Sequence, residues 1–223
     1  MEHQILVKKI EWVTHDVVRL LTDKPKEYNF IPGQATELAI DKDGLREQKR
    51  PFTFTSLPEN SELEFTIKIY ESHKGVTDKI QHLRVGDKLI IGDAWGAIQY
   101  KGPGTFIAGG AGITPFIAIL KDLNRKNMLN GNRLFFGNKT EKDIIYKSNL
   151  ETWLGDAFYN ILSEEEKEEY AQGQIDKEYL KKHNLDASSP VYLCGPPPMM
   201  DALIPALYAL GISESHLIKE GFE

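Results

Sequence analysis

The first hundred residues alternate between short apolar runs and turn-forming segments rich in Gly, Pro and Asp. Six of these runs have the length and the β-branched or aromatic content of strands. The predicted strands cover residues 5–10, 17–22, 35–40, 52–55, 63–70 and 89–91. A short helix is expected at about residues 76–83. Because several short strands at this spacing are typical of a closed antiparallel sheet, this half predicts a small barrel or sandwich.

Beyond the loop at residues 101–104, apolar runs of strand length alternate with segments of helical periodicity. The predicted strands cover residues 105–108, 133–136, 158–162, 191–194 and 217–219. The predicted helices cover residues 115–125, 148–154, 177–182 and 198–210. This alternation is typical of a doubly wound parallel sheet. We therefore predict a barrel domain over residues 1–101 and an α/β domain over residues 102–223.

The composition is that of an ordinary globular protein, with 41% hydrophobic and 27% charged residues. The formal net charge of −6 argues against a nucleic-acid partner, because such binding needs clustered Lys and Arg. The glutamate-rich run at residues 164–169 is interpreted as the solvated face of a helix. The N-terminus lacks the apolar segment of a secretory signal and no stretch is long enough to span a bilayer, so a cytoplasmic protein is expected.

Cysteine and histidine usage limits the metal chemistry of the chain. Cys194 is the only cysteine, so neither an intramolecular disulfide nor an iron–sulfur cluster held by four cysteines can form within these residues. The six histidines have no ligand-like spacing. We therefore predict no metal site.

A glycine-rich turn, GGAGITP at residues 109–115, separates a predicted strand from the helix that follows it. Glycines permit a tight turn and a close approach of backbone N–H groups to a ligand, and a helix N-terminus favours an anion. Pro115 suits the first helical turn, where its missing N–H would be unpaired anyway. A phosphate-bearing ligand fits this turn. A tight connection without a ligand also explains it, because the spacing is not G-x-G-x-x-G.

Other motifs accompany this turn in a fixed order: RPFTFTS at residues 50–56, YLCGPPPMM at residues 192–200 and EGFE at residues 220–223. In a strand, the even-numbered residues of RPFTFTS would share one face and the odd-numbered residues the other. Together the motifs resemble those of the ferredoxin–NADP reductase superfamily, particularly its compact bacterial flavodoxin/ferredoxin reductase and oxygenase reductase branch without an iron–sulfur domain. RPFTFTS resembles the R-x-Y-[ST] flavin motif, GGAGITP the nicotinamide-nucleotide motif and YLCGPPPMM the C-G-P-P motif.

The resemblance covers essentially the whole chain and implies a fold and a cofactor set. An N-terminal antiparallel flavin-binding β-barrel would precede a doubly wound parallel-sheet domain that binds the nicotinamide nucleotide. The flavin would be FAD, with FMN also possible, and the substrate NADPH or NADH. Hydride would pass from nicotinamide C4 to flavin N5, and electrons would leave singly for a flavodoxin, a ferredoxin or an oxygenase component. A free-flavin or small-molecule reductase and a non-catalytic flavin- or nucleotide-binding regulatory module are the alternatives.

The resemblance also implies roles on the flavin side. Arg50 would neutralise the flavin phosphates with its guanidinium. Phe52 stands at the family's tyrosine position, where its ring would stack on the isoalloxazine without a hydroxyl. Thr53 would place its hydroxyl near flavin N5. The other implied flavin-binding residues are Pro51, Lys68, Ile69, Tyr70, Gly75, Val76 and Thr77. For the last three, a plain helix N-cap made by Thr77 or Asp78 is the alternative.

On the nucleotide side, Cys194 is implied to face the nicotinamide ring, with a small core residue as the alternative. We do not expect a nucleophile, because no adjacent histidine is apparent to activate it. Glu220 would lie near the nicotinamide site and Phe222 would cover the flavin. Thr53, Cys194 and Glu220 are thus the candidate catalytic residues. The other implied nucleotide-binding residues are Gly110, Gly112, Thr114, Pro115, Asn138, Lys139, Gly195 and Pro196.

Two questions stay open in the sequence, the coenzyme and the electron acceptor. Lys139 could meet the 2′-phosphate of NADPH, whereas the absence of an arginine cluster there fits NADH equally well. The net negative charge disfavours an acidic acceptor, but a local patch at Lys42, Arg46 and Lys49 could still dock one.

Overall fold

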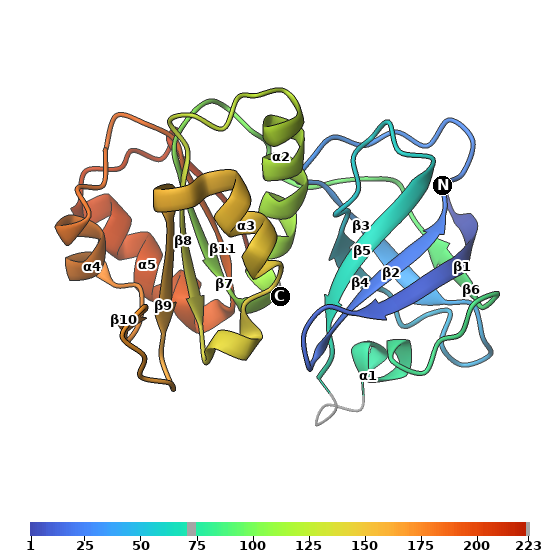
Figure 1. The fold of residues 1–223 in the computed structure, drawn as a ribbon. Helices are drawn as coiled ribbons and strands as arrows, with labels where there is room; N and C mark the ends of the chain where they lie inside the picture. The colour runs from blue at the N-terminus through green and yellow to red at the C-terminus, as the bar shows by residue number, and fades with distance from the viewer. Residues whose placement is uncertain (71–74, 222–223) are drawn as a thin grey trace.

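The computed structural model describes residues 1–70 and 75–221, which form two lobes side by side (Figure 1). The N-terminal lobe contains β1 (His3–Trp12), β2 (Val17–Asp23), β3 (Ala35–Ile40), β4 (Arg50–Thr53), β5 (Glu62–Lys68), α1 (Val76–Ile80) and β6 (Lys88–Ile91). The strands of the C-terminal lobe are β7 (Thr105–Gly109), β8 (Arg133–Asn138), β9 (Phe158–Leu162), β10 (Ala171–Gln172), β11 (Val191–Gly195) and β12 (Leu217–Gly221). Its α-helices are α2 (Thr114–Arg125), α3 (Lys147–Leu154), α4 (Lys177–Lys182) and α5 (Pro197–Ala209).

The N-terminal sheet has the order β4-β3-β6-β1-β2-β5, and all of its neighbouring strands are antiparallel. An isolated bridge between Phe54 and Phe65 joins the segment after β4 to β5, so the sheet nearly closes. Phe54 also stacks on Phe30 with ring centroids 4.3 Å apart. Aromatic and branched side chains thus fill the interior, and the predicted antiparallel barrel is confirmed.

The C-terminal sheet is parallel throughout, with the order β10-β9-β8-β7-β11-β12. Successive residues of β7 and β11 enter different apolar clusters: Phe106 and Cys194 lie in one, whereas Ile107 and Leu193 lie in the other. Helices α2 and α3 cover the first cluster and α4 and α5 the second (Figure 1). A sheet buried on both faces explains why these strands are continuous apolar runs, and it confirms the doubly wound domain.

Elements outside the predicted pattern are few. Strand β10 is two residues long, which is too short to leave a periodic signal. The interpretation of residues 164–169 as a helix face is wrong, because they form a loop between β9 and β10. Like charges four residues apart repel one another in a helix. In the loop, Glu165 instead accepts a hydrogen bond from the backbone N–H of Glu141 at 2.7 Å.

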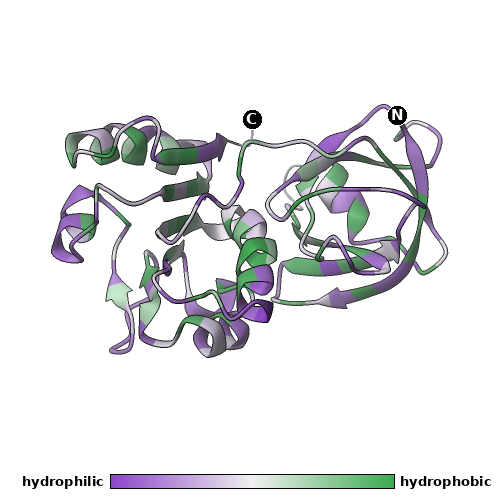
Figure 2. Cartoon of the chain, turned by 90° about the horizontal axis from the view of Figure 1, so that it is seen from above, coloured by the Kyte–Doolittle hydropathy of each residue, from purple (hydrophilic) through white to green (hydrophobic). Residues whose placement is uncertain are grey.

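The two lobes share part of their packing. Val17 of β2 belongs to the apolar cluster that contains α2, together with Ile98 of the segment that connects the lobes. Figure 2 shows the lobes from above, with hydrophobic residues gathered in the strands of both. Within the described residues, none of the helices has the length and apolar character needed to cross a membrane.

Candidate functional site

A cleft of about 890 Å³ lies where the two lobes meet. The barrel contributes β4, part of β5 and the start of α1 to its wall, and the α/β lobe contributes the carboxyl ends of β7, β8 and β11. In open parallel sheets, ligands bind in the crevice outside these carboxyl ends. The volume also suits a cofactor-sized ligand. A second cavity of about 620 Å³ lies beside Glu141 and Tyr170, and none of the sequence-predicted site residues lines it.

The flavin side of the cleft contains most of the residues implied by the sequence. The residues that line it are Arg50, Pro51, Phe52, Thr53, Lys68, Tyr70, Gly75, Val76 and Thr77. Four consecutive residues of β4 take part, although alternation predicted two separate faces. Strand β4 is the last strand of its sheet, so its unpaired edge as well as its faces can border the cleft. The sequence thus predicted correctly that this segment lines the site, but not that residues of both faces of the strand would do so.

The alternative explanation of residues 75–77 as a side-chain N-cap is wrong. Helix α1 has Gly75 as its N-cap residue and no side-chain capping hydrogen bond. Asp78 instead accepts a hydrogen bond from Gln81 Nε2 at 2.8 Å. Thr77 therefore lines the cleft without serving the helix as a cap.

The glycine-rich turn forms the nucleotide side of the cleft together with the loop after β11. A Cβ at Gly112 would lie 2.2 Å from the backbone oxygen of Cys194 and 2.7 Å from Cα of Gly195. Real side chains do not come so close, so the two loops pack backbone against backbone. Gly110 has a φ of +50°, in the left-handed region that glycine tolerates best. The glycines thus build a cradle whose backbone can approach a ligand closely.

Asn138, at the end of β8, has a side-chain amide that lines the cleft without a hydrogen-bond partner among the described residues. The residue is only 7% exposed, and both Nδ2 and Oδ1 are buried. An unpaired buried amide costs about 1–3 kcal/mol. A ligand with hydroxyl groups would satisfy both atoms. Neighbouring Lys139 also lines the cleft, and its Nζ pairs with Glu164 at 2.9 Å.

Other predicted nucleotide-binding residues also line the cleft, namely Gly110, Gly112, Thr114, Gly195 and Pro196. Pro115 and Ile69 are buried and are not part of its lining. Phe222 lies outside the described residues, so its implied position over the flavin stays a prediction.

Cys194 and Glu220 are neighbours on β11 and β12 rather than residues of the cleft lining. Cys194 is 0% exposed, and burial together with the charge of Glu220 raises the pKa of its thiol. It is therefore a neutral thiol, as expected for a residue that is no nucleophile. Burial also raises the pKa of Glu220, although its carboxylate accepts hydrogen bonds from the backbone N–H groups of Ala97 and Ile98. Those bonds tie β12 to the segment that connects the lobes.

Several residues that line the cleft were not among the site residues predicted from the sequence. Thr66 lies two residues before Lys68 on β5, so strand periodicity could have placed it on the same face. Met199 belongs to the YLCGPPPMM motif and lies against the cradle, since a Cβ at Gly109 would meet its sulfur at 2.4 Å. Gln174 reaches the cleft from a loop, and no local pattern in the sequence marks it.

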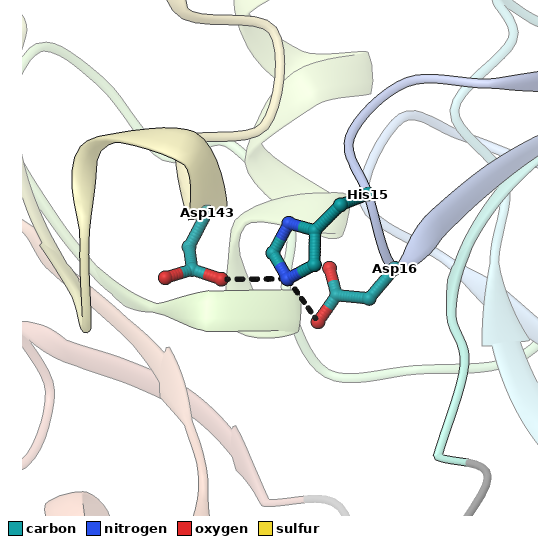
Figure 3. Close-up of side chains that lie close together, drawn as sticks. All are labelled: His15, Asp16 and Asp143. Carbon is teal, nitrogen blue, oxygen red and sulfur yellow. Dashed lines mark ion pairs between the residues drawn. The ribbon is translucent and has the colours of Figure 1, made fainter.

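A cluster of His15, Asp16 and Asp143 lies where the β1–β2 turn meets the C-terminal lobe (Figure 3). His15 Nε2 lies 3.7 Å from Asp16 and 3.6 Å from Asp143. Both carboxylates already have partners: Asp16 pairs with Lys68 at 2.5 Å, and Asp143 accepts from the backbone N–H of Thr140 at 2.8 Å. We read this cluster as a contact between the lobes and assign no ion to it.

Comparison with known proteins covers both lobes. Residues 2–103 match the family described as FAD-binding domain, and residues 106–204 match the oxidoreductase NAD-binding domain. The chain belongs to the ferredoxin–NADP reductase-like superfamily. The predicted resemblance is confirmed, as are FAD and a nicotinamide nucleotide as the ligands of its two domains.

Relatives in this superfamily include the ferredoxin–NAD(P)(+) reductase component of the naphthalene 1,2-dioxygenase system of Pseudomonas putida, 27% identical over 97% of this chain and 67% of that protein. The reductase component of propane 2-monooxygenase from Mycolicibacterium goodii is 30% identical over 97% of this chain and 66% of its own length. The chain thus spans about two thirds of these relatives. A ferredoxin NADP+ reductase from Neisseria gonorrhoeae with bound FAD and NADP has the same fold, with a TM-score of 0.86, 16% identity and coverage of 99% of this chain and 98% of that one.

Proposed function

We propose that this chain is a flavin-dependent NAD(P)H oxidoreductase that passes electrons to an external acceptor. The observation that carries the proposal is that one cleft between the lobes is lined by the flavin motif on one side and by the nucleotide motifs on the other. Bound FAD would supply the redox chemistry, namely acceptance of a hydride from the nicotinamide and release of single electrons. The same arrangement supports a division into residues 1–101 and 102–223.

The barrel residues of the cleft would bind and orient the flavin. Arg50 would neutralise phosphate charge, because its guanidinium is permanently charged and carries a fixed fork of donors. Phe52 would provide a stacking surface, and Gly75 to Thr77 would contact the phosphates. Thr53 is buried at the edge of the cleft, where its hydroxyl can offer a hydrogen bond to a ring nitrogen.

The α/β residues of the cleft would hold the nucleotide and exclude water. The backbone of residues 109–112 would bind phosphate oxygens, and the amide of Asn138 would meet the ribose hydroxyls. Of the three candidate catalytic residues, Thr53 alone is part of the described lining. We propose that Cys194 and Glu220 act behind the nicotinamide site, Cys194 as a neutral contact and Glu220 by holding β12 against the connecting segment.

The charges near Asn138 support NADH as the preferred coenzyme. Lys139 is the only Lys or Arg that the described part of the α/β lobe contributes to the lining, and it is paired with Glu164. Asp143 also lines the cleft. A 2′-phosphate would therefore meet no free positive charge there, whereas a ribose hydroxyl would meet no repulsion.

An oxygenase component or its ferredoxin is the acceptor we propose, on the strength of the relatives named above. The patch at Lys42, Arg46 and Lys49 offers little support for docking. Each of the three side chains pairs with a carboxylate, at 3.1, 2.5 and 2.7 Å respectively. Surface pairs of this kind leave little net positive charge for an acidic partner.

Cofactor identification combined with turnover tests this function. The purified protein is reconstituted with FAD, the released flavin is identified by mass, and NADH or NADPH oxidation is followed with ferricyanide, ferredoxin or free flavin as acceptor. We expect bound FAD and turnover with ferricyanide and ferredoxin, and about a tenfold or larger loss of FAD affinity in Arg50→Ala, since a charged hydrogen bond contributes about 1.5–3 kcal/mol. Failure to bind any flavin contradicts the proposal. Turnover with free flavin alone supports the small-molecule reductase, and bound flavin without turnover supports the regulatory module.

A further inference from the structure

A largely buried polar network joins the two lobes next to the cleft. Lys121 of α2 donates hydrogen bonds from Nζ to the backbone oxygen of Thr55 at 2.7 Å and to Glu64 Oε1 at 2.6 Å. Thr55 lies two residues beyond Thr53, on the segment that lines the flavin side of the cleft. Helix α2 begins at Thr114, directly after the glycine-rich turn. One side chain thus connects the helix of the nucleotide cradle to the end of the flavin segment.

Glu64 is a buried anchor for this connection. Glu64 is 4% exposed, and its carboxylate accepts hydrogen bonds from Thr55 Oγ1 and Arg19 Nε, both at 2.8 Å. Burial opposes ionisation, but the charge of Lys121 and the hydrogen bonds from Lys121, Thr55 and Arg19 hold the pKa of Glu64 below its ordinary value. Arg19 Nη2 also pairs with this carboxylate, at 2.7 Å, so Glu64 is an ionised group held in place within the barrel. Lys121 is therefore bound to a fixed point in the barrel.

The network extends to a second element of the α/β lobe. Thr55 Oγ1 lies 3.0 Å from Thr66 Oγ1, which lies 3.3 Å from the hydroxyl of Tyr146 at the start of α3. Burial raises the pKa of Tyr146 to about 12, so this hydroxyl stays protonated. Lys121 Nζ lies 5.7 Å from the centre of the Tyr146 ring. Thr66 itself lines the cleft, so the network reaches the ligand site.

We infer that Lys121 is a positioning residue, which sets the separation and angle between the flavin segment and the nucleotide cradle. The inference rests on the proposed function, because hydride transfer is what depends on that separation. Thr114 and Lys121 are seven residues apart, or about 10 Å along a rigid helix, so a shift at Lys121 is carried to the glycine-rich turn. A misplacement of about 1 Å can slow an enzymatic reaction about 100-fold. Other ionic contacts between the lobes are more exposed. Arg125 of α2 pairs with Glu59 of the barrel at 2.9 Å at the surface, and His15 lies 3.6 Å from Asp143.

Helix α2 provides a matched control for Lys121. Lys126 is the C-cap residue of this helix, and its side chain pairs with Asp122 of the helix itself at 2.6 Å. Flavin reduction by NADH is measured anaerobically by stopped flow in Lys121→Met, Lys121→Arg and Lys126→Met. In Lys121→Met we expect the reduction rate to fall about tenfold or more, while FAD content and the NADH dissociation constant change less than about threefold. Lys121→Arg should recover part of the rate, and Lys126→Met should match the parent.

A distance measurement tests the inference without turnover. Spin labels are attached to Leu6→Cys on β1 and Tyr208→Cys on α5, both 41% exposed in the parent, while the buried Cys194 stays unlabelled. Pulsed electron paramagnetic resonance should give one narrow distance in the parent and in Lys126→Met. The distribution should be broader or shifted in Lys121→Met.

Each outcome of these measurements decides the inference. A folded Lys121→Met protein with the parental distance distribution overturns it, as does a rate loss that only follows the loss of FAD. If Lys121→Met does not fold, Glu64→Gln takes its place, because a neutral acceptor keeps part of the contact and should produce a smaller change in the same direction. If the parent is not reduced by either coenzyme, the proposed function fails, and the spin-label distances still decide whether Lys121 fixes the lobes.

Discussion

Replacement of Gly112 by alanine tests whether the two nucleotide loops pack backbone against backbone. The added Cβ would lie 2.2 Å from the Cys194 oxygen, about 1.2 Å short of the 3.4 Å at which ordinary contact begins. Neither loop can turn a side chain away, so the backbone itself must move. Overpacking of this kind costs about 1–3 kcal/mol. For a chain of this size, that cost lowers Tm by roughly 2–12 °C.

Two neighbouring glycines provide graded controls, because both also line the cleft. A Cβ at Gly137 would meet its nearest atom, Ile175 Cδ1, at an ordinary 3.5 Å. A Cβ at Gly109 would meet the flexible Met199 side chain at 2.4 Å, which can rotate away. We therefore expect Gly137→Ala to leave Tm nearly unchanged, Gly109→Ala to lower it slightly and Gly112→Ala to lower it most.

The assay is thermal unfolding of the coenzyme-free variants by circular dichroism, followed by the KM for NADH of those that fold. Gly112→Ala should raise KM as well as lower Tm, since the same movement opens the cradle. Equal melting temperatures for Gly112→Ala and Gly137→Ala would show that the loops are not packed as described.

Three further substitutions test the charges and the amide described above. Glu164→Gln frees Lys139 and should lower the KM for NADPH several-fold without changing that for NADH, and an equal change for both coenzymes contradicts the coenzyme assignment. Asn138→Leu should raise the Tm of the coenzyme-free protein and raise the KM for NADH, because it removes an unpaired buried amide, and a lower Tm would mean that the amide has partners in solution. Hydrogen bonds from Lys147 and two other side chains hold the pKa of Glu141 at about 2, so the parent loses stability as pH falls from about 5 toward 2. Glu141→Gln should flatten this acid dependence of Tm, and an unchanged slope would assign it to other groups.

Much of the fold could be predicted because periodicity is local. The buried parallel strands are continuous apolar runs, and the barrel strands are short and bounded by Gly and Pro. The errors fall where tertiary contacts decide. Residues 164–169 have the charge pattern expected of a solvated helix face but form a loop. In this loop Glu165 bonds to the backbone of Glu141, and Glu164 pairs with Lys139. Strand β10 exists only through its pairing with β9.

The candidate site likewise contains residues that the sequence located and a contact that it could not show. Arg50, Gly112 and Asn138 lie in motifs or directly after predicted strands, so the sequence located them. The contact between Lys121 and Glu64 joins residues 57 positions apart, and no motif contains either one. Such a pair becomes visible only when the two lobes are placed side by side.

The central claim is that FAD and a nicotinamide coenzyme meet in the cleft between the lobes. Its most direct test is to mix the FAD-loaded protein with one equivalent of NADH without oxygen and to follow the visible absorption of oxidised flavin. The account predicts that this absorption is lost in a single turnover, and more slowly in Lys121→Met. Flavin that stays oxidised in the presence of both NADH and NADPH would contradict it.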